Sequence, residues 1–416
     1  MRFIGYRDRR GFARRGRSCY KTAAMLPIVQ PAADERPDLR SLPYAELGAL
    51  VERLGERPFR VRQLYRWLHK QGVASLDEMT DLPKALRERL AAETRLSQLA
   101  LDAVEQSVDG TRKYRLRTHD GRMIESVYMP DEGALASAGG VDDDEADEGA
   151  APAAKKRVRR TLCVSSQVGC AMDCKFCLTA TMGLVRHLAA GEIVEQVYRV
   201  NADLRAHGSG LSNEIRPLTN LVFMGMGEPL HNYENVKASL DLLLSAEGAN
   251  FSHRHVTVST SGHVPNIKRL GEETDVKLAI SLNATTDETR SRLMPINVRW
   301  PLEALMQACR EFPMRQGRRI TFEYVLLAGV NDTVDDALRL AKLVAGVPAK
   351  VNLIPYNDNA DLGFHEPPPE RVEAFKRALV ARHVTAIVRK NRGRDISGAC
   401  GQLAVAGQER TGSIRA

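Results

Sequence analysis

The residues from 162 to 177, LCVSSQVGCAMDCKFC, decide how this sequence folds and what it binds. They begin with LCVSS, a short apolar run typical of a buried strand. They continue into a CxxxCxxC triplet formed by Cys170, Cys174 and Cys177. Iron–sulfur cubanes take four ligands. Three thiolates on one loop therefore predict a [4Fe-4S] cluster with one iron left open to another molecule.

Strand and helix patterns alternate from Thr161 onward. Six apolar segments have the length of buried strands: LCVSS, NLVFMG, HVTVST, VKLAISL, ITFEYVLL and KVNLIPY. A helical pattern follows each, near residues 191–206, 233–246, 264–272, 287–293, 334–345 and 370–382. Repeated strand–helix units build a parallel sheet covered by helices. Because six units are too few for a closed eight-fold barrel, the predicted fold is α/β, a partial, open (β/α)6 barrel with its chemistry on the loops after the strands.

The composition limits the class of protein. Lys and Arg number 60 against 52 Asp and Glu, a net charge of +8 that favours a polyanionic partner such as RNA. The 7 cysteines are odd in number and three crowd together, which argues against a disulfide framework. No apolar run reaches the ~18 residues that span a bilayer, and no signal peptide is recognisable. We therefore expect a soluble, cytoplasmic protein without membrane contact.

The segments outside the barrel have other patterns. Apolar residues three and four positions apart predict a small helical domain, and alternation about a turn at 113–129 predicts a β-hairpin. Stretches dominated by charged residues, with few apolar ones, predict disorder. In chain order we expect a disordered basic tail (1–40), a helical RNA-binding accessory domain (41–105), a hairpin linker (106–133), a disordered acidic and basic insertion (134–160), the barrel core (161–391) and a C-terminal tail (392–416).

A zinc site is the alternative use of the three clustered cysteines. Thiolates also suit tetrahedral zinc, and Cys163 or His187 could supply the fourth ligand. Such a chain would be a zinc-stabilised RNA-binding protein without catalysis. The cysteine spacing, the aromatic Phe176 and the strand–helix series that follows favour the iron–sulfur cluster.

A glycine-rich turn, GMGEP at 225–229, ends the second predicted strand. Its glycines allow a ligand to approach the backbone closely, and the Glu228 carboxylate can accept a hydrogen bond from an ammonium group. An ordinary strand-to-helix turn has a similar composition. Its position one strand–helix unit after the cysteine loop favours the interpretation as a ligand-binding turn.

The triplet, the GMGEP turn and the barrel pattern resemble the radical S-adenosylmethionine superfamily. Within it, LCVSSQVGC at 162–170 and RGRDISGACGQL at 392–403 resemble the RlmN/Cfr branch, a family of RNA adenine methyltransferases. The resemblance covers residues 41–405 apart from the 134–160 insertion. It implies that S-adenosylmethionine binds the open iron and is cleaved to a deoxyadenosyl radical, so that the cofactors perform the chemistry and the protein directs it.

The same resemblance implies which residues surround S-adenosylmethionine. They lie at the ends of the predicted strands: Gly227, Glu228, Ser259, Ser281, Leu282, Asn283 and Asn357. Met224 also matches a position in the family's active site. Ser and Asn commonly cap loops, so this simpler role stays open for the polar residues of the set.

Three further residues have roles only through the resemblance. It implies that Cys400 carries the methyl group as S-methylcysteine, that Cys163 forms a transient disulfide with Cys400 to release the product, and that Glu125 accepts a proton from the base. Judged by sequence context alone, Cys400 is a thiol in the tail, Cys163 is a buried cysteine in a strand and Glu125 is a glutamate on the hairpin surface. Cys309 has apolar helical neighbours and is expected in the core.

The implied activity is the formation of 2-methyladenosine in 23S rRNA, at the peptidyl-transferase centre, and in tRNA next to the anticodon, with two S-adenosylmethionine molecules per turnover. Methylation of adenine C8 is the alternative, because both activities share this cysteine set. The target base must be exposed or flipped. Phosphate contacts are expected from Arg60, Arg62, Arg66 and Lys70 and from Arg389, Lys390, Arg392 and Arg394. Trp67 is expected to stack on a base, with a place in the core as the simpler alternative. A reducing protein such as flavodoxin or ferredoxin is the implied electron donor, and a monomer is expected.

Overall fold

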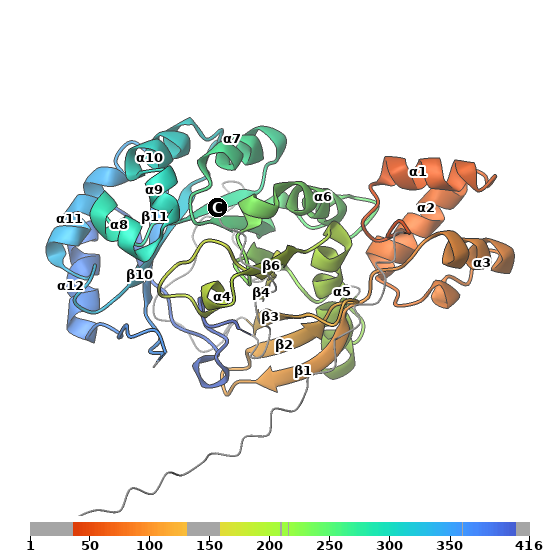
Figure 1. Ribbon diagram of the computed structural model, residues 1–416, viewed down its shortest axis with the longest axis horizontal. Coiled ribbons are helices and arrows are strands. Elements are labelled where there is room, and N and C mark those ends of the chain that lie inside the picture. Colours follow the sequence, from red (N-terminus) through yellow and green to blue (C-terminus); the bar gives the residue numbers. More distant parts are fainter. Residues whose placement is uncertain (1–35, 131–158, 209, 215, 360, 405–416) are drawn as a thin grey trace, which may run out of the picture. The chain divides into compact units, whose positions relative to one another are not determined.

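One sheet organises the part of the chain that the structure describes. The computed structural model describes residues 36–130, 159–208, 210–214, 216–359 and 361–404. Within them ten strands form one sheet in the order β1-β2-β3-β4-β7-β8-β9-β10-β11-β12 (Figure 1). Most of the predicted basic tail and insertion, and the last residues of the C-terminal tail, lie outside the described residues.

The parallel part of the sheet contains the six predicted strands in their predicted order. They are β4 (Arg160–Cys163), β7 (Asn220–Phe223), β8 (Val256–Thr260), β9 (Lys277–Ser281), β10 (Ile320–Leu326) and β11 (Ala349–Pro355). A further strand, β12 (Ala386–Val388), pairs in parallel with β11. β12 was not predicted, because three residues are too few to show a periodic pattern.

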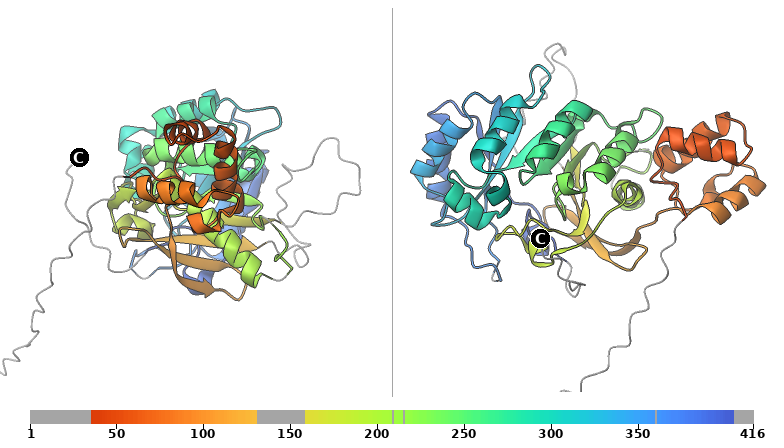
Figure 2. Two further views of the ribbon diagram at one scale, coloured as in Figure 1. Left: turned by 90° about the vertical axis from the view of Figure 1, so that its right-hand side faces the viewer. Right: turned by 45° about the horizontal axis from the view of Figure 1, so that its top comes forward.

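Helices connect the parallel strands, as the pattern predicted. The expected ones are α5 (Ala190–His207), α6 (Tyr233–Leu244), α7 (Val264–Glu273), α8 (Asp287–Leu293), α11 (Val334–Leu343) and α12 (Pro369–Val380). Two more lie in the connection between β9 and β10: α9 (Ile296–Arg299), which was not predicted, and α10 (Leu302–Glu311), which is the helix expected around Cys309. Figure 2 shows the longer helices outside the sheet. Side-chain caps begin some of them: Thr286 accepts from the Thr289 amide at the start of α8.

Three antiparallel strands extend the sheet beyond β4. They are β1 (Ala100–Gln106), β2 (Arg112–Arg117) and β3 (Met123–Pro130), and β3 pairs with β4 through Val127 and Cys163. The predicted hairpin corresponds to β2 and β3. β1 was not expected, and it begins inside the predicted helical domain. Its sequence ALDAVEQ contains one β-branched residue, and its pairing is interrupted by a register shift between Leu101 and Ala103, so it lacked a strand pattern.

The predicted helical domain contains α1 (Tyr44–Arg53), α2 (Phe59–Tyr65), a π-helix η1 (Arg66–Gln71), a 3-10 turn η2 (Leu76–Glu78) and α3 (Lys84–Glu93). Two predicted boundaries differ from the structure. Residues 36–40 are ordered rather than part of a disordered tail, because Leu39 is buried and the Arg40 guanidinium forms a buried ion pair with Glu195 on α5 (2.9 Å). Arg160, assigned to the insertion, is the first residue of β4.

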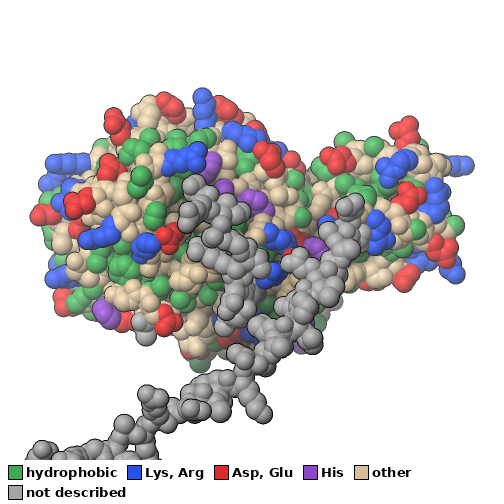
Figure 3. Space-filling model, viewed as in Figure 1, with side chains coloured by type: hydrophobic (Ala, Val, Ile, Leu, Met, Phe, Trp, Pro, Cys, Tyr) green, Lys and Arg blue, Asp and Glu red, His purple; other side chains and the backbone are tan. Residues whose placement is uncertain are grey.

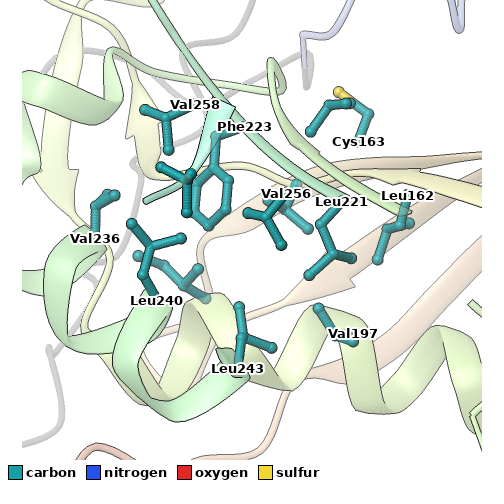
Figure 4. Close-up of a cluster of buried hydrophobic side chains, with 14 of the residues drawn as sticks. Leu162, Cys163, Val197, Leu221, Phe223, Val236, Leu240, Leu243, Val256 and Val258 are labelled. Atoms are coloured by element: carbon teal, nitrogen blue, oxygen red, sulfur yellow. The ribbon is translucent and has the colours of Figure 1, made fainter. Parts of the chain in front are cut away.

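The core next to the first parallel strands lies between the sheet and helices α5 and α6. Figure 4 shows Val197 and Leu243 from these helices facing Leu221 and Val256 of the sheet. Side chains alternate across a strand, so Cys163 points away from this apolar layer while Leu162 points into it. Cys163 is thereby placed on the inner face of the barrel. No helix in the described part of the chain is long and apolar enough to cross a membrane.

Candidate active site

The three clustered cysteines lie on the loop between β5 (Gln167–Gly169) and α4 (Leu178–Thr181). β5 pairs with the short strand β6 (Leu184–His187), so the cysteine loop is closed at its base. Gly169 has φ +74°, and a Cβ there would lie 1.8 Å from the Gly183 carbonyl oxygen, so only glycine fits this position. The Cys170 amide donates to the same carbonyl (2.9 Å). These contacts fix where the loop begins.

The three thiols lie close enough to influence one another. Burial, together with the smaller effect of the neighbouring Cys177 thiol, raises the pKa of Cys170 to about 12. Burial also raises the pKa of Cys174 and of Cys177, and Cys174 is affected by both other thiols. All three are free cysteines. Buried thiols of this kind ionise when a metal stabilises the thiolates.

The candidate fourth ligands of the zinc alternative lie apart from the triplet. His187 Nδ1 is hydrogen-bonded to Gln167 Nε2 (3.0 Å) and its ring meets the His231 ring edge-on. The Cys163 thiol interacts with the Cys400 thiol, as described below. Among the described residues no three His, Cys, Asp or Glu side chains come together as ligands of a single metal ion. Thiolates that bind a four-iron cluster each hold a different iron, and this arrangement fits that case.

The predicted glycine-rich turn lies directly against the strand that precedes the cysteine loop. Gly227 has φ +101°, and a Cβ there would lie 2.5 Å from Gln167 Cβ. The Glu228 amide donates to Gln167 Oε1 (2.8 Å). The turn therefore needs glycine for close packing against β5, in addition to any ligand.

Glu228 is a buried carboxylate beside the cysteine loop. Its Oε2 accepts hydrogen bonds from the amide and the hydroxyl of Ser261 (2.7 Å each), and its Oε1 accepts one from the Leu230 amide (3.0 Å). Within the described residues it has no paired cation, and burial raises its pKa. A carboxylate has more acceptor sites than these donors use. An ammonium group would supply the missing positive charge, which fits the amino group of S-adenosylmethionine.

The other predicted cofactor residues lie at strand ends but differ in what they contact. Ser259 is buried on β8, and the Leu282 side chain belongs to the core. Asn283, with φ +56°, accepts from the Val325 amide of β10 through Oδ1 (2.8 Å), so its side chain joins the end of β9 to β10. Asn357 accepts from Arg394 Nε (2.8 Å). The Ser281 carbonyl accepts from Arg290 Nη2 (3.1 Å).

Arg290 on α8 is a central residue that the sequence did not reveal. Its guanidinium is fully buried and donates to the carbonyls of Ser261, Ser281 and Leu282 and to Asn297 Oδ1. These bonds tie the ends of β8 and β9 together beside Cys174. Burial lowers the pKa of Arg290 to about 10, and the Cys174 thiol acts in the opposite direction. In sequence it is one of several arginines in a charged helix.

The two outlying cysteines line the same small cavity. Cys163 is buried at the end of β4, and burial together with the Cys400 thiol raises its pKa to about 12. Arg389 Nη1 donates to Cys400 Sγ (3.7 Å). Met224, a predicted active-site position, lines the same cavity. Cys309 lies in the core, as predicted.

The C-terminal segment also contacts the cysteine loop. The Leu178 amide donates to the Gly401 carbonyl (2.7 Å), and the Thr179 hydroxyl donates to the Leu403 carbonyl (2.5 Å). The Cys400 thiol acts on the pKa of Cys177 as well as on that of Cys163. Cys400 is therefore held between the predicted cluster site and Cys163.

Glu125 is a buried residue of β3 rather than a surface residue of the hairpin. Burial raises its pKa, while the Lys113 ammonium, 3.6 Å from Oε1, and the Ala404 amide lower it. Its backbone carbonyl accepts from the hydroxyl of Ser165 (2.6 Å), which lies in the segment between β4 and β5. The structure thus brings Glu125, Cys400 and Cys163 into one region.

Several of the residues expected to contact RNA form hydrogen bonds or ion pairs within the protein. Trp67 Nε1 donates to Asp81 (2.5 Å), Arg62 pairs with Glu247 (3.1 Å), and Arg392 donates to the Pro130 carbonyl (2.5 Å). Lys70 lines a cavity of about 220 Å³ that Arg205 and Arg216 also line. On the face shown in Figure 3, Lys and Arg side chains are interspersed with Asp and Glu rather than gathered in one patch.

The fold and the cysteine loop define a radical S-adenosylmethionine enzyme, and residues 164–341 match the model of that superfamily. Residues 37–96 match the N-terminal domain of ribosomal RNA large subunit methyltransferases. The chain belongs to the RlmN family of dual-specificity RNA methyltransferases. It is 61% identical over 374 residues to the family member of Anaeromyxobacter dehalogenans, covering 90% of this chain and 93% of that one.

Other relatives agree with this assignment. A second family member, RlmN 2 of Myxococcus xanthus, is 54% identical over 397 residues, which are 94% of this chain and 98% of the relative. A crystal structure of a radical SAM methyltransferase from Sphaerobacter thermophilus superposes with a TM-score of 0.77 at 43% identity, covering 88% of this chain and 99% of that one. The protein is therefore an RNA methyltransferase that uses a [4Fe-4S] cluster and S-adenosylmethionine. This excludes the alternative of a non-catalytic zinc protein.

Proposed function

We propose that the protein forms 2-methyladenosine in 23S rRNA, at the peptidyl-transferase centre, and in tRNA next to the anticodon. The proposal includes a methyl group carried on Cys400 as S-methylcysteine and two S-adenosylmethionine molecules per turnover. The main support is the position of Cys400, which lies between Cys163 and the cysteine triplet on a segment that also reaches Glu125.

Each residue of the site has one role in this proposal. Cys170, Cys174 and Cys177 hold the cluster, and the strand-end residues together with Gly227 and Glu228 hold S-adenosylmethionine, with Glu228 taking its ammonium group. When bound, the cluster and S-adenosylmethionine supply the methyl group and the radical that activates it.

The remaining steps use side chains of this chain. The Cys400 sulfur accepts the methyl group and presents it to the base. Glu125 removes the proton from adenine C2, which suits a buried carboxylate of raised pKa. The Cys163 thiolate then attacks Cys400 Sγ and breaks the bond between that sulfur and the carbon now attached to the base. This carbon takes up a proton to become the methyl group of the product, and the disulfide formed needs reduction before the next cycle.

The RNA reaches this site as an exposed or flipped base. Among the expected phosphate-binding residues, Arg66, Lys70 and Lys390 are exposed, and we propose that they contact the RNA backbone. Electrons come from a reducing protein such as flavodoxin or ferredoxin. The protein acts in the cytoplasm as a monomer.

The carrier role of Cys400 can be tested by trapping. Replacing Cys163 by Ala removes the thiol that frees the product, so RNA should stay covalently bound to Cys400 and migrate with the protein on a denaturing gel. The Cys163→Ala, Cys400→Ala double variant should show no adduct. Mass spectrometry of the purified wild type should find S-methylation at Cys400. An adduct that persists without Cys400 would overturn the proposal.

The position of methylation needs a separate measurement. Modified rRNA and tRNA are digested to nucleosides, and 2-methyladenosine is separated from 8-methyladenosine. The proposal expects the 2-methyl product from both RNAs. A product at C8 would support the alternative activity.

A further inference from the structure

The turn between β1 and β2 and the start of the C-terminal segment are joined by reciprocal hydrogen bonds. From the turn, Asp109 Oδ2 accepts from the Gly393 amide (3.0 Å). From the C-terminal segment, Asp395 accepts from the Ser107 hydroxyl through Oδ1 (2.5 Å) and from the Val108 amide through Oδ2 (3.3 Å). The turn and the C-terminal segment thus each contribute one carboxylate and at least one hydrogen-bond donor.

The backbone at this junction fits the contact closely. Gly393 has φ +61°, and a Cβ there would lie 3.0 Å from Thr111 Cγ2, so a side chain would crowd the turn. The turn itself is held by the Thr111 amide, which donates to Asp109 Oδ1 (2.9 Å). The Ser107 hydroxyl lowers the pKa of Asp395, so this carboxylate is ionised at neutral pH and accepts strong hydrogen bonds.

Backbone positions with positive φ follow the junction. Ser397 has φ +50° and Gly401 has φ +78°, with Gly398 between them. Cys400 lies five residues after Asp395, and five residues extend over at most about 17 Å. A fixed Asp395 therefore keeps Cys400 within about 17 Å of it, and in the structure Cys400 lines one cavity with Cys163.

We propose that the β1–β2 turn (Ser107–Thr111) is a clamp that fixes the base of the C-terminal segment and so positions Cys400 within reach of Cys163. Asp395, Ser107 and Asp109 are positioning residues. They touch neither substrate nor cofactor, and they act by keeping the two thiols at a high effective concentration. The inference rests on the proposed pairing of Cys163 with Cys400 and adds the element that makes the pairing efficient.

The test uses the intact enzyme with its cluster bound, kept free of oxygen. The variants are Asp395→Ala and Ser107→Ala, and the matched control is Asp241→Ala, which removes a carboxylate whose partner is Lys237 on α6. The fraction of Cys163–Cys400 disulfide in glutathione buffers, measured by mass spectrometry of peptides, gives the effective concentration of the two thiols. Loss of the clamp's hydrogen bonds should lower this effective concentration about fivefold to thirtyfold, and the control variant should leave it unchanged.

Hydrogen exchange provides a second measurement that does not depend on thiol chemistry. Peptides covering residues 396–404 should exchange faster in Asp395→Ala and Ser107→Ala than in the wild type and the control. Unchanged exchange would overturn the clamp, and faster exchange with an unchanged effective concentration would overturn its positioning role. If the wild type forms no Cys163–Cys400 disulfide while exchange still responds, the proposed release step fails and the clamp stands as a structural contact without a role in thiol pairing.

Discussion

Ser261 donates two hydrogen bonds to a single carboxylate oxygen of Glu228, one from its amide and one from its hydroxyl. The bonds join the loop after β8 to the loop after β7 and hold the carboxylate in one orientation. The geometry leaves a buried negative charge without a cation from the described part of the protein. A ligand that carries an ammonium group would bind here with a charge-assisted hydrogen bond.

Replacing Glu228 by Gln should therefore weaken S-adenosylmethionine binding. Hydrogen bonds to charged groups contribute about 1.5–3 kcal/mol, so we expect a loss of affinity of about tenfold to hundredfold. Equilibrium binding to the reconstituted protein measures it, and an unchanged cluster absorbance shows that the site is intact. Equal affinity in the variant would remove Glu228 from the cofactor site.

Replacing Arg290 by Met should destabilise the fold. Three backbone carbonyls and Asn297 would lose their donor in a buried place, and we expect a loss of about 2–4 kcal/mol in the free energy of unfolding. Denaturant unfolding measures it. The control is Arg292→Ala on the same helix, whose exposed side chain should contribute less than about 0.5 kcal/mol. Similar losses in both variants would contradict the role of Arg290.

Replacing Gly169 by Ala should prevent the cysteine loop from forming. The added Cβ would clash with the Gly183 carbonyl oxygen, and the backbone has positive φ. Gly121→Ala is the matched control, because φ is +77° there and nothing lies within 4 Å of the added Cβ. The control should cost about 1 kcal/mol. We expect Gly169→Ala to cost clearly more and to reduce the iron bound after anaerobic reconstitution, and equal iron content in both variants would contradict the clash.

The ion pairs of Arg186 should make stability depend on pH. Arg186 binds Glu192 through two hydrogen bonds (2.7 and 2.8 Å) and also binds Asp120. Burial acts to raise the pKa of Glu192, but the bonds from Arg186 dominate and lower it from 4.5 to about 2. A carboxyl group with a lowered pKa in the folded state stabilises the fold above the unfolded pKa, and this stabilisation is lost as the pH falls towards the folded pKa.

The corresponding measurement compares wild type with Arg186→Met on the cluster-free chain between pH 7 and pH 3. The difference in unfolding free energy should be roughly 3 kcal/mol at pH 7 and should shrink below about pH 4.5. Lys237→Met, which breaks an exposed pair with Asp241, should show a small difference at every pH. A constant difference for Arg186→Met would contradict the linkage.

The features that depend on local patterns were predictable from the sequence. Six parallel strands, their helices and the hairpin follow from hydrophobic periodicity, and the CxxxCxxC spacing indicates the cluster. β12 and β1 were not found because one is very short and the other lacks branched residues and has a register shift. In the connection between β9 and β10, the helix around Cys309 was recognised and is α10, whereas the four residues of α9 are too few to show a period.

The features that depend on distant residues were not predictable from the residues alone. Asp109 and Gly393 are hydrogen-bonded although 284 positions separate them. The sequence around Glu125 indicates a surface glutamate, whereas in the structure it is buried and contacts Ser165 and the Ala404 amide, which are distant in sequence. Arg290 is the clearest case, because its four acceptors belong to segments that meet only in the folded chain.

The interruption in β1 has a consequence for association between molecules. An open sheet edge offers unpaired amide and carbonyl groups to strands of other chains, and bulges, charges and short strands discourage this. β1 is one edge of the described sheet and has a register shift next to Asp102, and β12 at the other edge is three residues long. Both edges are therefore poor templates for strand addition, which protects this large sheet from aggregation.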